Sequence, residues 1–179
     1  MITVVADNGA RWSRAALATP LGPLTVVYAG TAVVAATFDE DPGPYWFGRE
    51  VEPAQAPSWL ERLVETALCA SLGPVAWSLV DPGLSALEAR ALSEATAIPF
   101  GETRAYGEVA RSMGYPGRAR LVGRAMSRSP ASLLIPTHRV IRADGRPACP
   151  ERTGMPERLR AYERRVTQTE STGRDRGRG

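Results

Sequence analysis

The sequence has little of what metal and disulfide sites are made from. Its 179 residues include one histidine, His138, and two cysteines, Cys69 and Cys149. Two cysteines form no disulfide framework, and one histidine without paired cysteines forms no zinc site. We therefore expect no metal and no cofactor. The low cysteine content also favours the reducing cytoplasm.

Lysine and long apolar runs are missing as well. All 22 basic residues are arginine, and the longest apolar stretch, residues 24–38, is interrupted by Gly30 and Thr31. A membrane-spanning helix needs about 20 apolar residues. No signal-peptide pattern opens the chain. We expect neither secretion nor membrane insertion, and a globular protein of one large or two small domains.

Charge is distributed unevenly along the chain. Residues 1–97 carry 5 arginines and 11 acidic residues, whereas residues 98–179 carry 17 arginines and 8 acidic residues. Seven arginines and no acidic residue lie between Glu108 and Asp144. This asymmetry indicates that the second half faces a polyanion such as nucleic acid, and a solvated arginine face is the alternative.

Apolar stretches in the first half alternate with turn residues. Residues 11–18, 24–29 and 32–38 are typical of strands, and the segments between them contain the proline and glycine of turns. Residues 58–61 (SWLE) have the pattern of a capping box, and the helix that they begin ends near Gly73. The first half therefore predicts an α+β domain over residues 1–84, an antiparallel meander with one helix.

The second half has a mainly helical pattern. A capping box at residues 85–88 (SALE) begins a helix that ends near residue 97. Residues 106–113 and 118–127 predict two helices that form a helix-turn-helix with a slightly long turn. We further expect a short buried strand at 133–135 and a last helix at 156–166. These elements form one predicted domain, 85–167, followed by a disordered tail, 168–179.

One predicted helix carries a row of cations. Arg120, Arg124 and Arg128 recur every four residues, so they share one face of helix 118–127. Gly123 lies inside the same helix, where glycine costs about 1 kcal/mol. It indicates that a nucleic-acid groove or a neighbouring helix approaches the backbone closely. An arginine-lined helix usually enters the major groove, because the minor groove admits a helix only with small side chains and a widened duplex.

Three motifs in this half resemble one protein family. They are residues 98–110 (IPFGETRAYGEVA), 119–126 (ARLVGRAM) and 135–141 (IPTHRVI). In this order they closely resemble the O6-alkylguanine-DNA alkyltransferases, and the resemblance is continuous from about residue 86 to 166. Residues 19–24 (TPLGPL) are more weakly similar to the start of that family's first domain. The resemblance implies a ribonuclease-H-like N-terminal domain and a C-terminal domain of the winged helix-turn-helix type.

The resemblance also implies a chemistry. Family members transfer the alkyl group from the O6 atom of guanine to a cysteine in a Pro-Cys-His-Arg-Val motif, once and irreversibly. Their helix-turn-helix enters the minor groove. Arg120 matches the arginine that fills the gap left by the flipped nucleotide, and Tyr106 matches the tyrosine that rotates its phosphate. Gly123 matches the close-approach glycine, His138 the water-linked base, and Glu163 the carboxylate that orients it.

Thr137 stands where the family has its acceptor cysteine. The reaction needs a thiolate, and a threonine hydroxyl is a far poorer nucleophile whose branched carbon crowds a displacement. We therefore expect no self-alkylation at Thr137. Ser129 replaces the family's hinge asparagine, and residues 147–152 replace the loop that roofs the guanine pocket. The expected pocket residues are Met126, Ser129, Pro136, Arg139, Pro147, Ala148 and Cys149.

Cys149 allows two interpretations. It lies three residues from both Arg146 and Arg152, which favour a thiolate, so it could be a relocated acceptor. We favour a small loop residue without chemistry, because a displaced sulfur must still come within about 3.5 Å of the alkyl carbon along the right line.

The sequence predicts an alkyltransferase-like DNA-repair protein without enzymatic activity. We expect it to bind double-stranded DNA, hold a flipped O6-alkylguanine without transfer, and mark it for nucleotide-excision repair proteins, as a cytoplasmic monomer. Arg118, Arg124 and Arg128 are expected phosphate contacts, with Arg111. The alternative is an enzyme on the same scaffold that acts on a small molecule in a biosynthetic or self-resistance pathway. It would use Thr137, His138 and Glu163 as hydroxyl, base and orienting group.

Overall fold

The computed structural model describes residues 2–38, 45–46, 49–70, 76–80, 83–146 and 154–176. Within these ranges the first half forms a mixed sheet in the order β1-β7-β4-β3-β2-β6-β5. Its strands are β1 (Ile2–Val5), β2 (Trp12–Leu17), β3 (Leu24–Ala29), β4 (Ala32–Thr37), β5 (Tyr45–Trp46), β6 (Arg49–Pro53) and β7 (Trp77–Val80). The expected antiparallel meander is its centre, β2-β3-β4. Parallel pairing adds β6 beside β2, β7 beside β4 and β1 beside β7.

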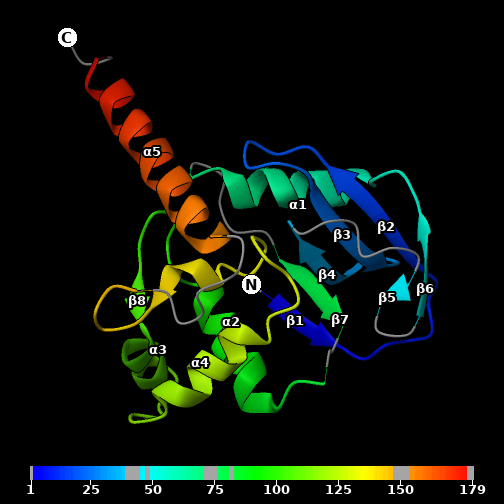
Figure 1. Cartoon of the computed structure of the whole chain (residues 1–179), viewed down its shortest axis with the longest axis horizontal. Helices are drawn as coiled ribbons and strands as arrows, with labels where there is room; N and C mark the ends of the chain where they lie inside the picture. Colours follow the sequence, from blue (N-terminus) through cyan, green and yellow to red (C-terminus); the bar gives the residue numbers. More distant parts are fainter. Residues whose placement is uncertain are drawn as a thin grey trace.

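Helix α1 (Ser58–Leu68) lies along the sheet (Figure 1). It begins one residue earlier than the capping-box pattern predicts, because Pro57 already has the extended conformation of an N-cap. Its buried Leu60, Leu63 and Val64 pack in one core with Leu24 of β3 and Leu79 of β7. The sheet therefore buries one face under this helix.

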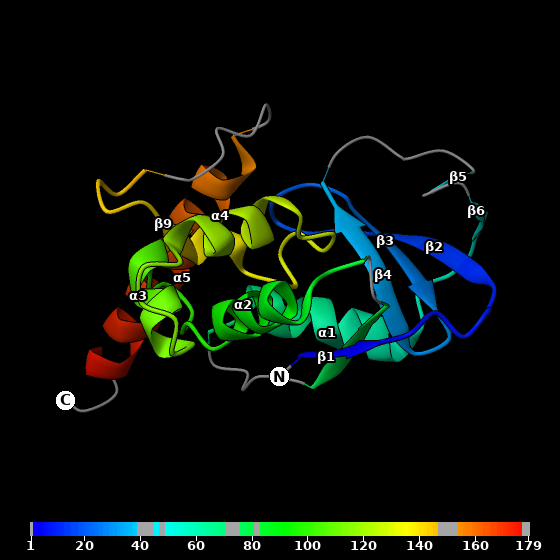
Figure 2. The ribbon, with the colours of Figure 1, turned by 90° about the horizontal axis from the view of Figure 1, so that it is seen from below.

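The second half contributes four α-helices among its described residues: α2 (Ala86–Thr96), α3 (Tyr106–Ser112), α4 (Ala119–Ser127) and α5 (Met155–Arg176). Helices α2, α3 and α4 gather at one end of the molecule, away from the meander (Figure 2). Strands β8 (Arg104–Ala105) and β9 (Val140–Ile141) form a parallel pair. Leu92 of α2 and Val122 of α4 belong to the same core cluster as the sheet, so both halves share one hydrophobic core. None of the described helices is both long and apolar enough to span a membrane.

Residues 133–135 form a buried turn, so the predicted strand there is wrong. Leu133, Leu134 and Ile135 are buried as expected, but Leu133 has φ +69°, which a strand does not permit. A three-residue apolar run cannot distinguish a strand from a buried turn by its periodicity. The segment is instead attached to the sheet just before this turn, because Ala36 of β4 donates to the Pro130 carbonyl and accepts from the Ser132 amide, each at 2.8 Å.

The expected disordered tail is also wrong over most of its length. Helix α5 continues through Arg176 and projects from the body of the molecule (Figure 1). No proline follows Pro156, and lengthening a helix that has already formed costs far less than starting one. The polar composition of this segment predicts solvent exposure, but not the loss of helical structure.

Candidate functional site

Thr137 begins a short 3₁₀ helix, Thr137–Arg139, directly after the buried turn. Pro136 is fully enclosed, whereas Thr137 keeps partial exposure. The Thr137 amide donates to the Ile135 carbonyl at 2.7 Å, and the Arg139 amide donates to the Pro136 carbonyl at 3.0 Å. These bonds hold the Thr137 backbone in a fixed turn between two buried segments.

His138 and Glu163 meet in the interior. The distance from His138 Nε2 to Glu163 Oε1 is 2.7 Å, and both side chains are almost completely buried. They come from elements far apart in the sequence, the 3₁₀ helix and the third turn of α5, whose Met155 and Leu159 are buried in the core. The structure therefore brings together the expected base and the expected orienting carboxylate.

Arg139 completes this cluster. Its Nε and Nη2 donate to Glu163 at 2.8–3.1 Å, its Nη1 donates to the Ile98 carbonyl at 2.7 Å, and its guanidinium lies over the Phe100 ring. Arg139, which the sequence predicts in the pocket lining, binds Glu163 in the structure. The Gly101 amide adds a further bond to Glu163 Oε2 at 2.9 Å.

The Gly101 contact requires glycine. Gly101 has φ +79°, and a Cβ atom there would lie 2.7 Å from the Thr167 hydroxyl. Sequence reasoning did not identify this position as part of the site. The Glu102 amide donates to the Pro99 carbonyl at 3.1 Å, so Gly101 is the third residue of a β-turn. A glycine in such a turn was the available signal, because a positive φ at this position favours glycine.

The cluster fixes the protonation of both partners. Burial acts to raise the pKa of Glu163, but the hydrogen bonds and charges of His138 and Arg139 outweigh it and lower the pKa to about 2. Burial lowers the pKa of His138 despite the neighbouring carboxylate. Glu163 is therefore ionised and His138 neutral near pH 7. Since Nε2–H then donates to Glu163, Nδ1 carries a free lone pair, and this buried atom has no hydrogen-bond partner within the described residues.

Helices α3 and α4 form the expected helix-turn-helix, joined by residues 113–118. Tyr106, the first residue of α3, packs beside Gly123 of α4: a Cβ atom on Gly123 would meet the Tyr106 ring at 3.9 Å, an ordinary contact. Packing inside the protein therefore tolerates alanine at position 123. Because Gly123 has no side chain, nothing projects from the surface of α4 at this position.

The arginines at the start of α4 and those towards its end have different partners. Arg118 and Arg120 are exposed, and neither forms an ion pair with any described residue. Arg124 and Arg128 both reach a buried carboxylate, Glu88 of α2, at 3.0 Å. Glu88 was recognised in the sequence only as part of a capping box.

The structure describes some of the other residues that the sequence predicts in the pocket. Met126 and Pro136 are buried. Ser129 has a buried hydroxyl without a hydrogen-bond partner among the described residues. Pro147, Ala148 and Cys149 lie outside the described residues, so the structure does not place the loop that carries the relocated-acceptor interpretation.

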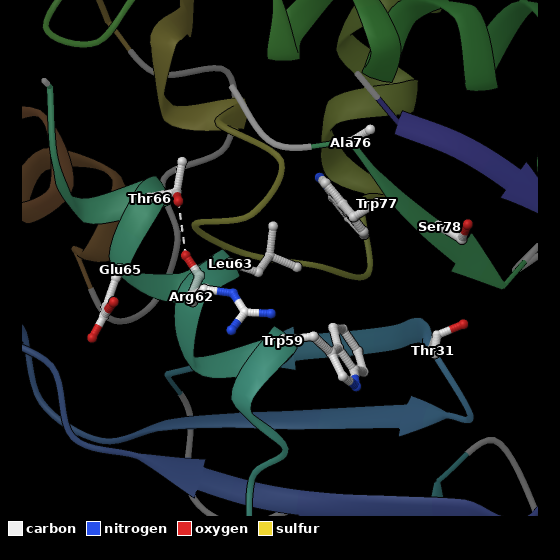
Figure 3. A pocket seen from close by; sticks show the side chains of 9 residues that line it. All are labelled: Thr31, Trp59, Arg62, Leu63, Glu65, Thr66, Ala76, Trp77 and Ser78. Carbon is white, nitrogen blue, oxygen red and sulfur yellow. Dashed lines mark hydrogen bonds between the residues drawn. The ribbon is translucent and has the colours of Figure 1, made fainter. Parts of the chain in front are cut away.

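A cavity of about 610 Å³ lies elsewhere, between α1 and the sheet (Figure 3). Trp59 and Leu63 of α1 face Trp77 of β7 across it, with Arg62 at its side (Figure 3). None of the residues that line this cavity comes from the Thr137 turn, α4 or α5.

The second half of the chain is similar to known proteins. Residues 86–165 match the family described as 6-O-methylguanine DNA methyltransferase, DNA binding domain. A methylated-DNA–protein-cysteine methyltransferase of Mycobacterium leprae is 58% identical over 48 residues, which are 27% of this chain and 29% of the relative. The chain thus matches less than a third of that relative's length.

Solved structures resemble nearly the whole chain. Mycobacterium tuberculosis OGT in complex with DNA is 27% identical, with a TM-score of 0.70 over 86% of this chain and 94% of that one. The O6-methylguanine methyltransferase of the same organism is 28% identical, with a TM-score of 0.72 over 87% and 94% of the two chains. Residues 86–165 therefore resemble the DNA-binding domain of the 6-O-methylguanine DNA methyltransferases, and the chain as a whole shares the fold of these two Mycobacterium tuberculosis structures.

Proposed function

We propose that this protein binds duplex DNA through the minor groove and captures a flipped O6-alkylguanine without accepting the alkyl group. One observation carries the proposal: a threonine follows Pro136 in a fold whose base and orienting carboxylate, His138 and Glu163, remain hydrogen-bonded at 2.7 Å. The capturing scaffold is thus retained while the nucleophile is replaced. In this proposal the bound lesion is handed to nucleotide-excision repair proteins, and the protein acts as a cytoplasmic monomer.

The chemistry of Thr137 supports binding without transfer. Neutral His138 offers a free Nδ1 lone pair, and general-base assistance contributes about 10²–10⁴ in rate. That contribution is too small to make a threonine hydroxyl attack the unactivated alkyl carbon of an ether. Cysteine succeeds in such displacements because its thiolate is populated and strongly nucleophilic.

Exposed cations on the helix-turn-helix support DNA binding. Arg118 and Arg120 face solvent at the start of α4, and Arg111 is exposed on α3. Ala119 and Gly123 keep this helix slim, which suits a minor groove about 6 Å wide. We assign Arg120 to the gap left by the flipped base, and Tyr106 to the phosphate of the flipped nucleotide.

We also propose a functional division after Leu84. Residues 85–167 bind DNA and hold the base, and residues 1–84 support the Thr137 turn through the bonds between Ala36 and residues 130 and 132. In this division Met126, Ser129 and Pro136 line the base pocket. Gly123 allows the DNA backbone to approach α4.

The decisive experiment compares duplexes with and without O6-methylguanine. We expect tighter binding to the lesion duplex, an unchanged protein mass after incubation, and an intact lesion. A protein that gains the mass of one methyl group overturns the capture proposal. Methylation mapped to Thr137 would make the protein an alkyltransferase, and methylation mapped to Cys149 would identify a relocated acceptor.

A second function is favoured by one specific observation. His138 is hydrogen-bonded to Glu163 and directly follows Thr137 in the sequence, so a hydroxyl, a neutral base and an orienting carboxylate, the three groups of an activated nucleophile, come from one region of the fold. An enzyme on this scaffold could therefore use Thr137 on a small molecule of a biosynthetic or self-resistance pathway. Absence of both lesion-selective binding and protein methylation in the same experiment favours this alternative.

A further inference from the structure

Glu88 is a buried carboxylate outside the Thr137 site. It lies in the first turn of α2 with 1% of its surface exposed. Its Oε2 accepts hydrogen bonds from the Ser85 amide at 2.9 Å and the Ser85 hydroxyl at 2.7 Å. The bond from the Ser85 amide is one half of the capping box of α2, and the Glu88 amide, which donates to the Ser85 hydroxyl at 3.3 Å, supplies the other half. Both bonds to the carboxylate use one of its two oxygens.

The second oxygen points to the DNA-facing helix. Oε1 accepts from Arg124 Nε and from Arg128 Nη1, both at 3.0 Å. Arg128 also donates through Nη2 to the Gly83 carbonyl at 3.2 Å. Capping of α2 needs neither arginine, because a glutamine in this position forms the same box. The negative charge of Glu88 therefore binds Arg124 and Arg128 and is not needed to cap α2.

The two arginines are held in different ways. Arg124 is attached through Nε, so its two terminal nitrogens have no partner among the described residues, and 62% of its side chain is exposed. Arg128 has both terminal nitrogens bonded within the protein and is 45% exposed. The terminal nitrogens of Arg124 can therefore bind a ligand, whereas both terminal nitrogens of Arg128 are already bonded within the protein.

We infer that Glu88 is a positioning residue for DNA binding, which presents Arg124 to a phosphate and withholds Arg128 from the DNA. The inference rests on the proposed DNA binding and goes beyond it by removing Arg128 from the phosphate contacts. Holding Arg124 in one rotamer before binding lowers the entropy lost when the phosphate arrives. Because Arg128 stays bound to Glu88, it adds no phosphate contact to α4. The affinity for DNA of any sequence is therefore lower.

The carboxylate stays charged wherever the protein is folded and active. Hydrogen bonds from the backbone and hydroxyl of Ser85, together with the Arg128 charge, lower the pKa of Glu88 to about 2 against the opposing effect of burial. Variants at position 88 therefore test charge, and a glutamine keeps the capping box while it removes the ion pairs.

The experiment measures affinity for an undamaged duplex as a function of salt between about 50 and about 200 mM. Each phosphate contact contributes about 0.9 to the slope of log affinity against log salt concentration. We expect Arg124→Ala to flatten the slope by about 0.9 and Arg128→Ala to flatten it much less. Glu88→Gln releases Arg128, so it steepens the slope by about 0.9, and adding Arg128→Ala to Glu88→Gln removes that gain.

Equal effects of Arg124→Ala and Arg128→Ala overturn the inference, and so does a Glu88→Gln slope equal to that of the parent protein. If circular dichroism shows that Glu88→Gln is unfolded, the comparison of the two arginine variants decides, because each of them leaves Glu88 one arginine. A parent protein without salt-dependent binding overturns the proposed DNA binding itself. Normal parent binding with an unchanged Glu88→Gln slope overturns this inference alone.

Discussion

Glu88 and Glu163 are both buried carboxylates that hold basic side chains, and their pKa values are both lowered to about 2. Their partners differ. Glu88 holds arginines whose side chains are about half exposed, whereas Glu163 holds His138 and Arg139, which are almost fully buried. The same chemical group thus organises an outward cationic surface in one place and an inward base in the other. Exposure of the partner decides which of these it does.

The largest expected effect concerns the residue that the inward cluster serves. Thr137→Cys supplies a thiol beside His138, so we expect it to acquire methyl transfer from O6-methylguanine DNA, where the parent protein shows none. Intact-protein mass spectrometry detects the added methyl group. Thr137→Ser, which keeps a hydroxyl without the branched carbon, is the control and stays unmodified. Transfer to the serine variant would show that crowding and not nucleophilicity limits the parent protein.

Removing the inward carboxylate comes next in size. Glu163→Gln leaves the Arg139 charge buried without its partner, so we expect a loss of about 3–5 kcal/mol in the free energy of unfolding. Urea denaturation measures it. Glu157→Gln is the matched control on the same helix, because the Glu157 carboxylate is half exposed and lies 3.6 Å from Arg160, so we expect it to contribute less than about 1 kcal/mol. Equal losses in both variants would refute the buried cluster as a stabilising unit.

The next prediction concerns Gly101, whose backbone amide binds the buried Glu163 carboxylate. Gly101→Ala combines a left-handed conformation with a close contact to Thr167, whereas Gly114→Ala has the same φ of +79° and open space around it. The conformation alone costs about 1–2 kcal/mol, so Gly114→Ala should fall in that range and Gly101→Ala above it. Thermal unfolding of the two variants measures the difference. Identical melting temperatures would mean that Thr167 moves aside without cost.

The next prediction concerns Arg120, an exposed arginine of α4. Because flipping a base costs a few kcal/mol, Arg120→Ala should lower the ratio of lesion to undamaged affinity by about tenfold. Arg118→Ala should weaken binding to both duplexes alike. Fluorescence anisotropy with the two duplexes gives both ratios. If the two variants behave the same, Arg120 is a phosphate contact like Arg118.

The last prediction concerns the response to acid. The pKa of Glu163 is about 2 in the folded protein against an ordinary value of 4.5, so its stabilisation is complete above about pH 4.5 and is lost as the pH falls towards 2. One such group costs at most about 1.4 kcal/mol per pH unit in this window. Denaturation at several pH values should show a shallower acid limb for Glu163→Gln than for the parent protein.

Local patterns predicted much of this architecture. The meander, α1, the helix-turn-helix and the meeting of His138 with Glu163 all follow from spacing or from the family resemblance. Strands β1 and β7 were missed, because four-residue strands in parallel pairing need a partner distant in the sequence. The four-residue spacing predicted that Arg128 shares one exposed helix face with Arg120. In the structure the Arg128 guanidinium binds the Glu88 carboxylate, which lies forty positions away in the sequence. Such tertiary contacts leave no periodic signal.

The bonds that Ala36 makes with residues 130 and 132 bear on the order in which the site forms. The Ser132 amide points at a strand that is synthesised long before it, so the Thr137 turn gains this support only after β4 has found its place in the sheet. Hydrogen exchange of the Ser132 amide should therefore follow opening of the sheet and not local fraying of the turn. Because such long-range closure is slow, β4 carries part of the kinetic barrier to a working site.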